Sequence, residues 1–508
     1  MPSSFGVVDL FAGPGGLGEG FASVEDEGHS PFRIGISIEK EASAHRTLSL
    51  RAFLREHRSR TGTLPAEFLA FHAGKTGEPE WADIDADAWS TATEEARHLE
   101  LGTPEAAQTV DEAIARLREQ FDDTVLIGGP PCQAYSLVGR ARAKGKPDYV
   151  PEEDDRNYLF REYIGVLDKL RPAAFVMENV KGMLSSTVDS RKVFEMLMED
   201  LASLGTGAEH LYEIRAIHLE NGVASLREAR QSKDFVIHAE QFGVPQRRHR
   251  VIIVGIRADL AASIDNASIL VPGEHRTVLD VIGNLPRLRS SISRGGDSEA
   301  AWCEEVVDHA KLLAALHPDD PDRDTYEFVA GALAKTRPFP RSSTRLPEGY
   351  ATSDDDLLRW LERPELRAIA QHETRSHMAS DLGRYLFASV FGKTHGHSPK
   401  ARDFPAMLEP NHGNWHSGKF NDRFRVQLGN EPSTTVTSHI SKDGHYFIHP
   451  DPLQCRSLTV REAARLQSFP DDYLFLGNRT QQYVQVGNAV PPDLARYIAR
   501  LLYRVLTA

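Results

Sequence analysis

Short, β-rich apolar runs alternate with longer amphipathic stretches through residues 1–260, and this alternation constrains the fold more than any other feature. Most of the runs are bounded by Gly or Pro. Strands that alternate with helices form βαβ units, which build a mostly parallel sheet. The sequence therefore predicts an α/β fold, with strands at residues 5–11, 33–38, 124–127, 173–177 and 250–255 and helices at residues 42–57, 156–170 and 193–204.

The rest of the chain lacks this alternation. Residues 58–123 are acidic and carry no clear strand, so we expect helical insertions there. Residues 290–297 (SSISRGGD) are typical of a linker, and the segment that follows them is acidic, Pro-rich and irregular. Helical periodicity returns at residues 459–467 and 492–506. At about 100–200 residues per domain, a chain of 508 residues is expected to hold two or three domains.

Composition excludes several classes of protein. The chain has 59 Lys and Arg against 73 Asp and Glu, so its formal net charge is 59 − 73 = −14, which argues against indiscriminate binding to polyanions. Its three cysteines, Cys132, Cys303 and Cys455, are too few and too widely spaced for a disulfide framework or a zinc knuckle. No apolar run approaches the ~20 residues of a membrane helix, and Met1 to Ser4 lacks the basic start of a secretory signal. We therefore expect a cytoplasmic protein with no membrane contact.

A glycine-rich turn, Asp9–Gly18 (DLFAGPGGLG), closes the first predicted strand and opens a helix. Glycines let the backbone approach a ligand closely, and a helix N-terminus offers free N–H groups. Gly13, Gly15 and Gly18 fit the spacing of a dinucleotide fingerprint, and Glu39 ends the second strand, where it could hold a ribose. The motif indicates a nucleotide-like cofactor, but it does not distinguish NAD from S-adenosylmethionine. A turn with only a structural role is the alternative.

Three polar segments lie at strand ends. Cys132 belongs to the rigid loop Gly128–Gln133 (GGPPCQ), which follows the third strand at the carboxyl edge of the sheet, where open α/β folds bind ligands. Glu178 ends the next strand, and the basic segment Gln246–Arg250 (QRRHR) precedes an apolar strand. These residue types suit a thiol nucleophile, an acid and an anion-binding surface. The alternatives are a buried structural cysteine, a surface acid and a solvated basic turn.

Six sequence blocks occur in an order that resembles the cytosine-C5 DNA methyltransferase family. They are DLFAGPGG at Asp9–Gly16, GGPPCQAYS at Gly128–Ser136, ENV at Glu178–Val180, QRRHR at Gln246–Arg250, LTVREAARLQSFPDDY at Leu458–Tyr473 and VGNAVPP at Val486–Pro492. The resemblance covers residues 5–290 and 455–508. It implies a Rossmann-like S-adenosylmethionine-dependent methyltransferase domain, with a mostly parallel sheet and helices on both faces, and an inserted, smaller target-recognition domain.

The resemblance also implies a reaction. Cys132 takes the place of the family's nucleophile, which attacks C6 of cytosine and makes C5 reactive toward the methyl group of S-adenosylmethionine. Glu178 would engage the ring N3 and the amino group. Arg248 and Arg250 would stabilise the adduct and position the flipped nucleotide. No metal is required by this chemistry, and none is expected.

Further site residues follow from the same resemblance. The residues expected to bind the cofactor are Phe11, Gly13, Gly15, Leu17, Glu39, Pro131, Asn488 and Val490. The residues expected to contact DNA are Gln133, Ser136, Arg140, Arg142 and Gln246. Residues 137–146 would form a mobile loop that closes over the DNA. The acid near the adenine amino group stays open among Asp83, Glu100 and Asp111, and the last helix is expected to pack back against the first strand.

The expected domains are a catalytic domain at residues 1–288, a target-recognition domain at residues 289–454, and a C-terminal part of the catalytic domain at residues 455–508. In the family, the inserted region varies with the DNA sequence that is read. The family places its target-recognition domain between the QRRHR and LTVREAARLQ blocks, and this position sets the boundaries of the three segments.

Charge divides the expected recognition domain. Residues 299–366 hold 8 Lys and Arg against 15 Asp and Glu, whereas residues 372–430 hold 8 against 5. We therefore expect residues 372–430 to read DNA, with the candidates Arg375, Arg384, Lys393, Lys400, Arg402, Lys419, Arg423 and Arg425. The spaced pair His395 and His397 is expected to form hydrogen bonds rather than to bind zinc, because no cysteine lies nearby.

The leading prediction is a cytosine-C5 DNA methyltransferase that flips its target base out of a specific sequence of duplex DNA. We expect a monomer with a role in bacterial restriction–modification or phage defence, where other proteins of such a system would be its partners. A tRNA cytosine methyltransferase built on the same motifs is one alternative, and the long insertion argues against it. A catalytically silent DNA-binding protein is another, and the intact set of Cys132, Glu178 and Arg248 argues against it.

Overall fold

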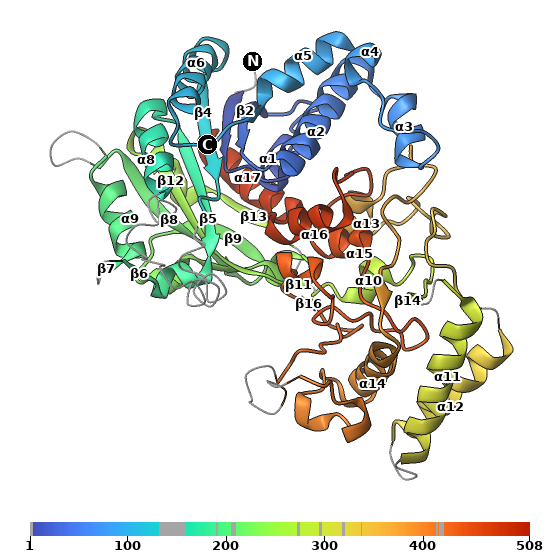
Figure 1. The fold of residues 1–508 in the computed structure, drawn as a ribbon. Coiled ribbons are helices and arrows are strands. Elements are labelled where there is room, and N and C mark those ends of the chain that lie inside the picture. Colours follow the sequence, from blue (N-terminus) through green and yellow to red (C-terminus); the bar gives the residue numbers. More distant parts are fainter. Residues whose placement is uncertain are drawn as a thin grey trace.

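The computed structural model of the chain describes residues 4–131, 159–188, 191–204, 210–271, 275–293, 297–316, 321–336, 338–412, 415 and 421–508. A ten-stranded mixed sheet with the order β13-β9-β8-β12-β5-β4-β1-β2-β3 lies at its centre, and β10 pairs with β12 beside this path (Figure 1). Helices pack on both faces of the sheet, so the predicted α/β class is confirmed. Within the described ranges, no helix is long and apolar enough to cross a membrane.

Parallel strands form the half of the sheet that carries the predicted site. Across the sheet they are β5 (Ala174–Val180), β4 (Asp123–Gly128), β1 (Phe5–Leu10), β2 (Phe32–Glu39) and β3 (Ala96–His98). Four of them coincide with predicted strands, whereas β3 lies in the segment where only helices were expected. A strand of three residues is too short to show an alternating pattern. Because these strands run in one direction, their carboxyl ends meet at one edge of the sheet.

Antiparallel strands extend the sheet beyond β5. They are β12 (His249–Arg257), β8 (Tyr212–Glu220), β9 (Val223–Arg227), β13 (Ser268–Leu270) and β10 (Val236–His238). The sequence predicted only β12 among them. Arg250 of β12 pairs with Val180 of β5, so β12 begins where β5 ends. This register brings the basic segment to the carboxyl edge of the parallel strands.

Each face of the sheet has its own hydrophobic core. One face is covered by α6 (Pro104–Gln120), α8 (Leu159–Leu170) and α9 (Val193–Ala202). The other is covered by α1 (Gly16–Ala22) and α17 (Pro492–Leu506). Neighbouring strand residues alternate between the two cores, with Val7 of β1 in one and Val8 in the other, as expected for a sheet buried on both sides.

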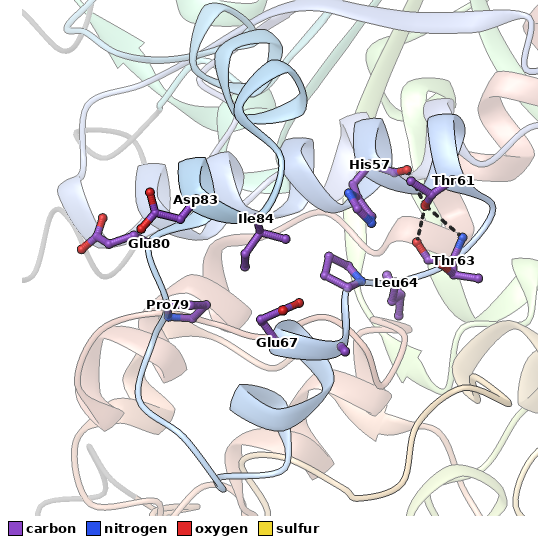
Figure 2. A pocket seen from close by; sticks show the side chains of 11 residues that line it. His57, Thr61, Thr63, Leu64, Glu67, Pro79, Glu80, Asp83 and Ile84 are labelled. Atoms are coloured by element: carbon purple, nitrogen blue, oxygen red, sulfur yellow. Dashed lines mark hydrogen bonds between the residues drawn. The ribbon is translucent and has the colours of Figure 1, made fainter.

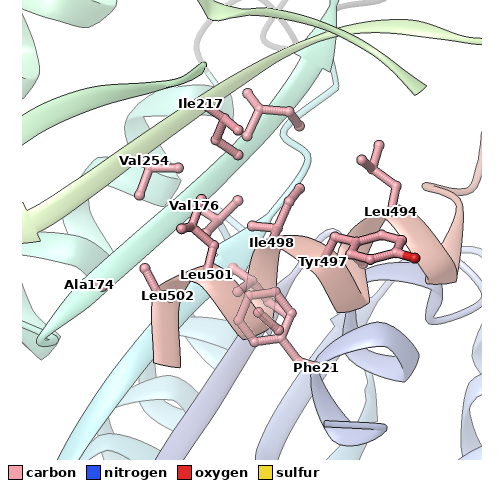
Figure 3. Packing of buried hydrophobic residues seen from close by; sticks show 14 of the residues in the cluster. Phe21, Ala174, Val176, Ile217, Val254, Leu494, Tyr497, Ile498, Leu501 and Leu502 are labelled. Atoms are coloured by element: carbon pink, nitrogen blue, oxygen red, sulfur yellow. The ribbon is translucent and has the colours of Figure 1, made fainter. Parts of the chain in front are cut away.

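The last helix completes the domain that the first strand begins. Leu494, Ile498 and Leu501 of α17 share a core with Val176 and Val254 of the central strands (Figure 3). Val7 of β1 belongs to the same core. The expectation that the two ends of the chain meet is therefore confirmed.

The predicted helix at residues 42–57 is confirmed as α2 (Ala42–Thr61). Within residues 58–123, where helical insertions were expected, the helices are α3 (Ala66–His72), α4 (Trp81–Ile84), α5 (Ala86–Glu95) and α6. Phe53, Phe68 and Trp81 make a small core between α2, α3, α4 and α5, and Leu476 from the C-terminal part joins it. These helices are thus packed onto the C-terminal segment of the chain.

The remaining α-helices of the described residues lie between residues 278 and 488. They are α10 (Val278–Ile282), α11 (Glu299–Leu316), α12 (Arg323–Lys335), α13 (Asp356–Leu361), α14 (Ala379–His395), α15 (Val460–Leu466) and α16 (Arg479–Asn488). Three two-stranded sheets add β6 (Thr187–Val188) with β7 (Arg191–Lys192), β11 (Gln246–Arg247) with β16 (Ser433–Thr434), and β14 (Ser291–Ile292) with β15 (Ser376–His377).

Two cores organise the inserted region. Trp302, Tyr385 and Phe424 belong to a core built from α11, α12, α14 and the segment that follows α14. Trp360 of α13 instead shares a core with Phe469 and other residues of the C-terminal blocks. Residues 289–454 therefore have a core of their own and also share one with the C-terminal segment.

Candidate active site

The glycine-rich turn leads from β1 into α1 at the carboxyl edge of the sheet. Gly13 and Gly15 have φ angles of 60° and 100°, which glycine adopts without steric cost. Gly13 N–H donates a hydrogen bond of 2.8 Å to Glu39 Oε2, and Glu41 N–H donates one of 2.7 Å to Glu39 Oε1. Burial raises the pKa of the Glu39 carboxyl. No described atom lies within 4 Å of the place a Gly13 Cβ would take, so the turn presents open backbone to a ligand.

The C-terminal blocks close this turn from the other side. A Cβ on Gly16 would lie 2.1 Å from Val490 O, so only glycine allows this approach. The Tyr473 hydroxyl donates a hydrogen bond to Pro14 O. Asn488 ends α16 with an exposed side chain, two residues before Val490. Tyr473 lies in one of the matching blocks, but the sequence assigned it no role, because its contact is with a residue 459 positions away.

Phe11 and Leu17, both expected to bind the cofactor, lie in different surroundings. Phe11 is half-buried with a φ of 57°, an uncommon conformation for a bulky residue that marks a turn held by its surroundings. The Leu17 side chain is 5 % exposed and belongs to the core shared with α17. Leu17 can therefore face a ligand only through its backbone.

The structure separates the three acids that the sequence left open. Glu100 lies two residues after β3, at the carboxyl edge of the sheet, and its Oε1 is 2.9 Å from Lys40 Nζ. Asp83 lies on α4 beside Glu80, where it lines a cavity of about 750 Å³ between the inserted helices (Figure 2). Asp111 lies on α6 and pairs with Lys169. Of the three, only Glu100 is next to the strand that carries Glu39.

Glu178 forms an ion pair with Arg250 where β5 ends and β12 begins. Glu178 Oε1 is 2.9 Å from Arg250 Nε, and both side chains are largely buried. Burial lowers the pKa of the Arg250 guanidinium, and the Glu178 carboxylate opposes this shift. A Cβ on Gly129 would lie 3.0 Å from Glu178 Oε2, and Asn179 Nδ2 donates a hydrogen bond of 3.0 Å to Pro130 O. The loop after β4 therefore lies against the Glu178 carboxylate.

The described part of this loop ends at Pro131, which is half-buried. The predicted nucleophile, Cys132, follows it directly in the sequence. The predicted residues that lie outside the described ranges are Cys132, Gln133, Ser136, Arg140 and Arg142, together with the loop at residues 137–146.

Arg248 and Gln246 are buried, whereas Arg248 was expected to position the flipped nucleotide and Gln246 to contact DNA. Arg248 is 1 % exposed, and its guanidinium donates hydrogen bonds of 2.9 Å to Val436 O and 3.3 Å to Gly487 O. Gln246 is fully buried, donates to Leu466 O at 3.1 Å and accepts from Val436 N–H at 2.8 Å. Burial, with Arg250 as a cationic neighbour, lowers the pKa of Arg248 well below its usual range. Both side chains join the segment before β12 to the C-terminal blocks, so the structure does not place Gln246 on a surface open to DNA.

Several of the candidate DNA-reading residues pair with other groups between residues 381 and 443. Arg384 pairs with Asp381 at 2.7 Å, and Arg423 pairs with Asp443 at 3.1 Å. Further engaged residues are Arg425, which pairs with Asp422, and Arg375, which donates to Ile440 O. The exposed candidates are Lys393, Lys400 and Arg402, while Lys419 lies outside the described residues.

Curated relatives match nearly the whole chain. Type II methyltransferase M.Bpa9945I of Bacillus paralicheniformis is 32% identical over 522 residues, covering 98% of this chain and 99% of the relative. Type II methyltransferase M.AgeI of Thalassovita gelatinovora is 25% identical, covering 97% and 98%. DNA (cytosine-5-)-methyltransferase M.ApeKI of Aeropyrum pernix is 26% identical and covers both chains completely.

Structure and family comparisons agree with these relatives. A crystal structure of an E. coli prophage-encoded protein, assigned as a DNA modification methyltransferase, superposes with a TM-score of 0.55 at 18% identity, covering 99% of this chain and 100% of that one. This likeness supports the fold. The model of the C-5 cytosine-specific DNA methylase family matches residues 81–292 and 327–504. The chain therefore belongs to the C-5 cytosine-specific DNA methylase family.

Proposed function

We propose that the chain methylates C5 of cytosine within a specific sequence of duplex DNA, with Cys132 as nucleophile and Glu178 and Arg250 as the groups that bind the reacting base. Its family makes it a cytosine-C5 DNA methyltransferase that uses S-adenosylmethionine. The observation that carries the proposed site is the Glu178–Arg250 ion pair, which lies against the loop that leads into Cys132.

The chemistry requires a nucleophile because cytosine C5 is too electron-poor to attack a methyl donor unaided. Addition of the Cys132 thiolate to C6 would form an S–C6 bond and move electron density toward C5 and N3. S-adenosylmethionine supplies the methyl group as an electrophile. Loss of the C5 proton to a base then restores the C5–C6 double bond and releases the Cys132 thiolate.

The Glu178 carboxyl would hydrogen-bond to the ring N3 and the exocyclic amino group. Charge builds on N3 as the thiolate adds, so a group that holds a proton there lowers the barrier. Arg250 fixes the orientation of Glu178 and brings a positive charge to the same place. We assign Arg248 a positioning role, because its two carbonyl contacts hold the segment that leads to Arg250.

The residues at the glycine turn fit S-adenosylmethionine. The Glu39 carboxylate, oriented by two backbone N–H groups at the end of β2, suits the ribose hydroxyls. The open backbone at Gly13 allows close approach of the ligand. We assign Glu100 to the adenine amino group, because it follows the neighbouring strand at the same edge of the sheet. The further cofactor contacts that we propose are Phe11, Gly15, Leu17, Pro131, Asn488 and Val490.

The biological setting that we propose is a restriction–modification system, since type II methyltransferases match the chain almost from end to end. Residues 289–454 would recognise the target sequence, which their separate core supports. The enzyme would act as a monomer in the cytoplasm, where it meets DNA, alongside the other proteins of such a system.

Labelled S-adenosylmethionine and bisulfite sequencing test this proposal. Incubation with duplex DNA is expected to transfer label to the DNA and to protect cytosine in one recurring sequence, whereas tRNA stays unlabelled. Glu178→Gln keeps the size of the side chain, and we expect it to lower kcat about 10²–10⁴-fold with little change in cofactor affinity. Glu94→Gln on the exposed face of α5 is the matched control. Label in tRNA alone, or full activity in Glu178→Gln, would contradict the proposal.

A further inference from the structure

Outside the proposed active site, His238, Glu240 and His249 bring three metal-ligand side chains together beside the β10–β12 pair. His238 and His249 are partners in the antiparallel register, and their rings stack with centroids 3.9 Å apart. Glu240 Oε1 lies 2.9 Å from His249 Nε2 and 3.8 Å from His238 Nδ1. One ligand atom from each residue lies within 4.8 Å of the other two.

The state of Glu240 is the second observation. Its side chain belongs to η5 (Ala239–Phe242) and is buried, with the residue only 8 % exposed. Glu240 Oε2 has no hydrogen-bond partner among the described residues. A buried carboxylate oxygen without a donor is costly, because nothing replaces the water that it loses on folding. A bound cation beside this oxygen would remove that cost.

We infer that His238, Glu240 and His249 form a binding site for a divalent transition metal of the Zn²⁺, Co²⁺ and Ni²⁺ class. Imidazole nitrogens select these ions over Mg²⁺ and Ca²⁺, which prefer oxygen ligands. Tetrahedral bonds of about 2.0–2.1 Å place ligand atoms roughly 3.3 Å apart. The observed separations of 2.9 and 3.8 Å fall on either side of this value. The two rings stack at an interplanar angle of 13°, so they must turn out of this stack before both nitrogens point at one ion.

The chemistry of the site follows from its ligand count and position. Three protein ligands leave a fourth place for water, and the partly exposed His238 and His249 leave a path from solvent. A bound ion would clamp β10 and η5 to the start of β12. Arg250 follows His249 directly and pairs with Glu178, so the clamp would steady the strand that presents this ion pair.

Cobalt titration of the full chain tests this inference. After removal of metal with EDTA, Co²⁺ is added and the visible d–d absorption is recorded, followed by competition with Zn²⁺. We expect one Co²⁺ per chain with a spectrum typical of four nitrogen and oxygen ligands, and displacement by Zn²⁺. His238→Asn is expected to raise the Kd at least about 100-fold, since loss of a hydrogen-bond partner of a metal ligand alone costs about 10–100-fold.

Two further variants keep the result decisive. Glu240→Gln preserves shape and removes the charged ligand, so it should also abolish the absorption, while its circular dichroism and melting without metal report that the fold is intact. The double variant His395→Asn/His397→Asn removes another close histidine pair, with ring centroids 6.3 Å apart, and should titrate as the unmodified chain does. The inference is overturned if the unmodified chain gives no absorption, if His238→Asn and Glu240→Gln bind as it does, or if only the control variant loses binding.

Discussion

Gly20→Ala tests how the two ends of the chain are joined. Gly20 lies in α1 where this helix crosses α17. A Cβ at this position would lie 2.4 Å from Ala495 Cβ, 2.5 Å from Pro492 O and 2.6 Å from Arg496 N. Two of these atoms are backbone, so no side-chain rotation relieves the clash, and the helices must separate by roughly 1 Å to reach ordinary contact.

The effect of Gly20→Ala on the free energy of unfolding has two opposing contributions, overpacking and helix propensity. Overpacking of this kind costs about 1–3 kcal/mol. Alanine in a helix interior gains about 1 kcal/mol over glycine. Gly165→Ala on α8 is the matched control, because no described atom lies within 4 Å of its added Cβ. This variant gains the helix propensity of alanine without a steric clash. The two variants should therefore differ by about 1–3 kcal/mol.

Urea denaturation monitored by fluorescence measures this difference. We expect Gly20→Ala to have a lower midpoint than Gly165→Ala at an equal m value. Calorimetric titration with S-adenosylmethionine should also give Gly20→Ala a Kd about tenfold higher, or about 1.4 kcal/mol, because α1 carries the glycine turn. Equal midpoints for the two variants would refute the close packing of α1 on α17.

Three further predictions concern stability and specificity. Asp471→Asn removes a buried carboxylate that lies 2.6 Å from Arg465 Nη2 and leaves that arginine only the more distant carboxylate of Glu362, at 3.6 Å. We therefore expect a loss of about 3–5 kcal/mol in chemical denaturation, and an unchanged midpoint would contradict the structural role of the pair. Burial lowers the pKa of His372 to about 4, so the unfolded chain takes up the proton first as the pH falls below about 6.5. This residue alone should therefore remove about 2 kcal/mol of stability between pH 7 and pH 5. A His372→Gln variant with the same pH dependence of stability would refute this. Exchange of residues 372–430 for the corresponding segment of a related methyltransferase should change the methylated sequence found by bisulfite sequencing, and an unchanged sequence would show that DNA is read elsewhere.

The parallel half of the fold was predictable because its signals are local. Short apolar runs marked four of its five strands, and a regular helical pattern marked α17. The direction shared by these strands then placed the glycine turn, Glu39 and Glu178 at one edge without any knowledge of side-chain contacts. Glu100 escaped assignment because it depends on β3, whose three residues carry no period.

Contacts between distant segments were not predictable in the same way. Alternation along an extended segment places Gln246, Arg248 and Arg250 on one side, but it does not say what covers that side. That side is covered by Val436, Leu466 and Gly487, which lie about 190 to 240 residues later in the sequence. These residues bury the side chains of Gln246 and Arg248. The cluster of His238, Glu240 and His249 likewise depends on the antiparallel register of β10 and β12, a strand pair that the sequence did not reveal.

A covalent trap on Cys132 tests the proposed mechanism most directly. In duplex DNA made with 5-fluorocytosine, C5 carries fluorine, which cannot leave as a cation, so the adduct formed after methyl transfer cannot collapse. We predict a denaturant-stable complex that requires S-adenosylmethionine, with the DNA attached to the peptide that contains Cys132, and no complex in Cys132→Ser. Attachment at Cys303 or Cys455, or the absence of any covalent complex from a preparation that methylates ordinary DNA, would contradict the mechanism.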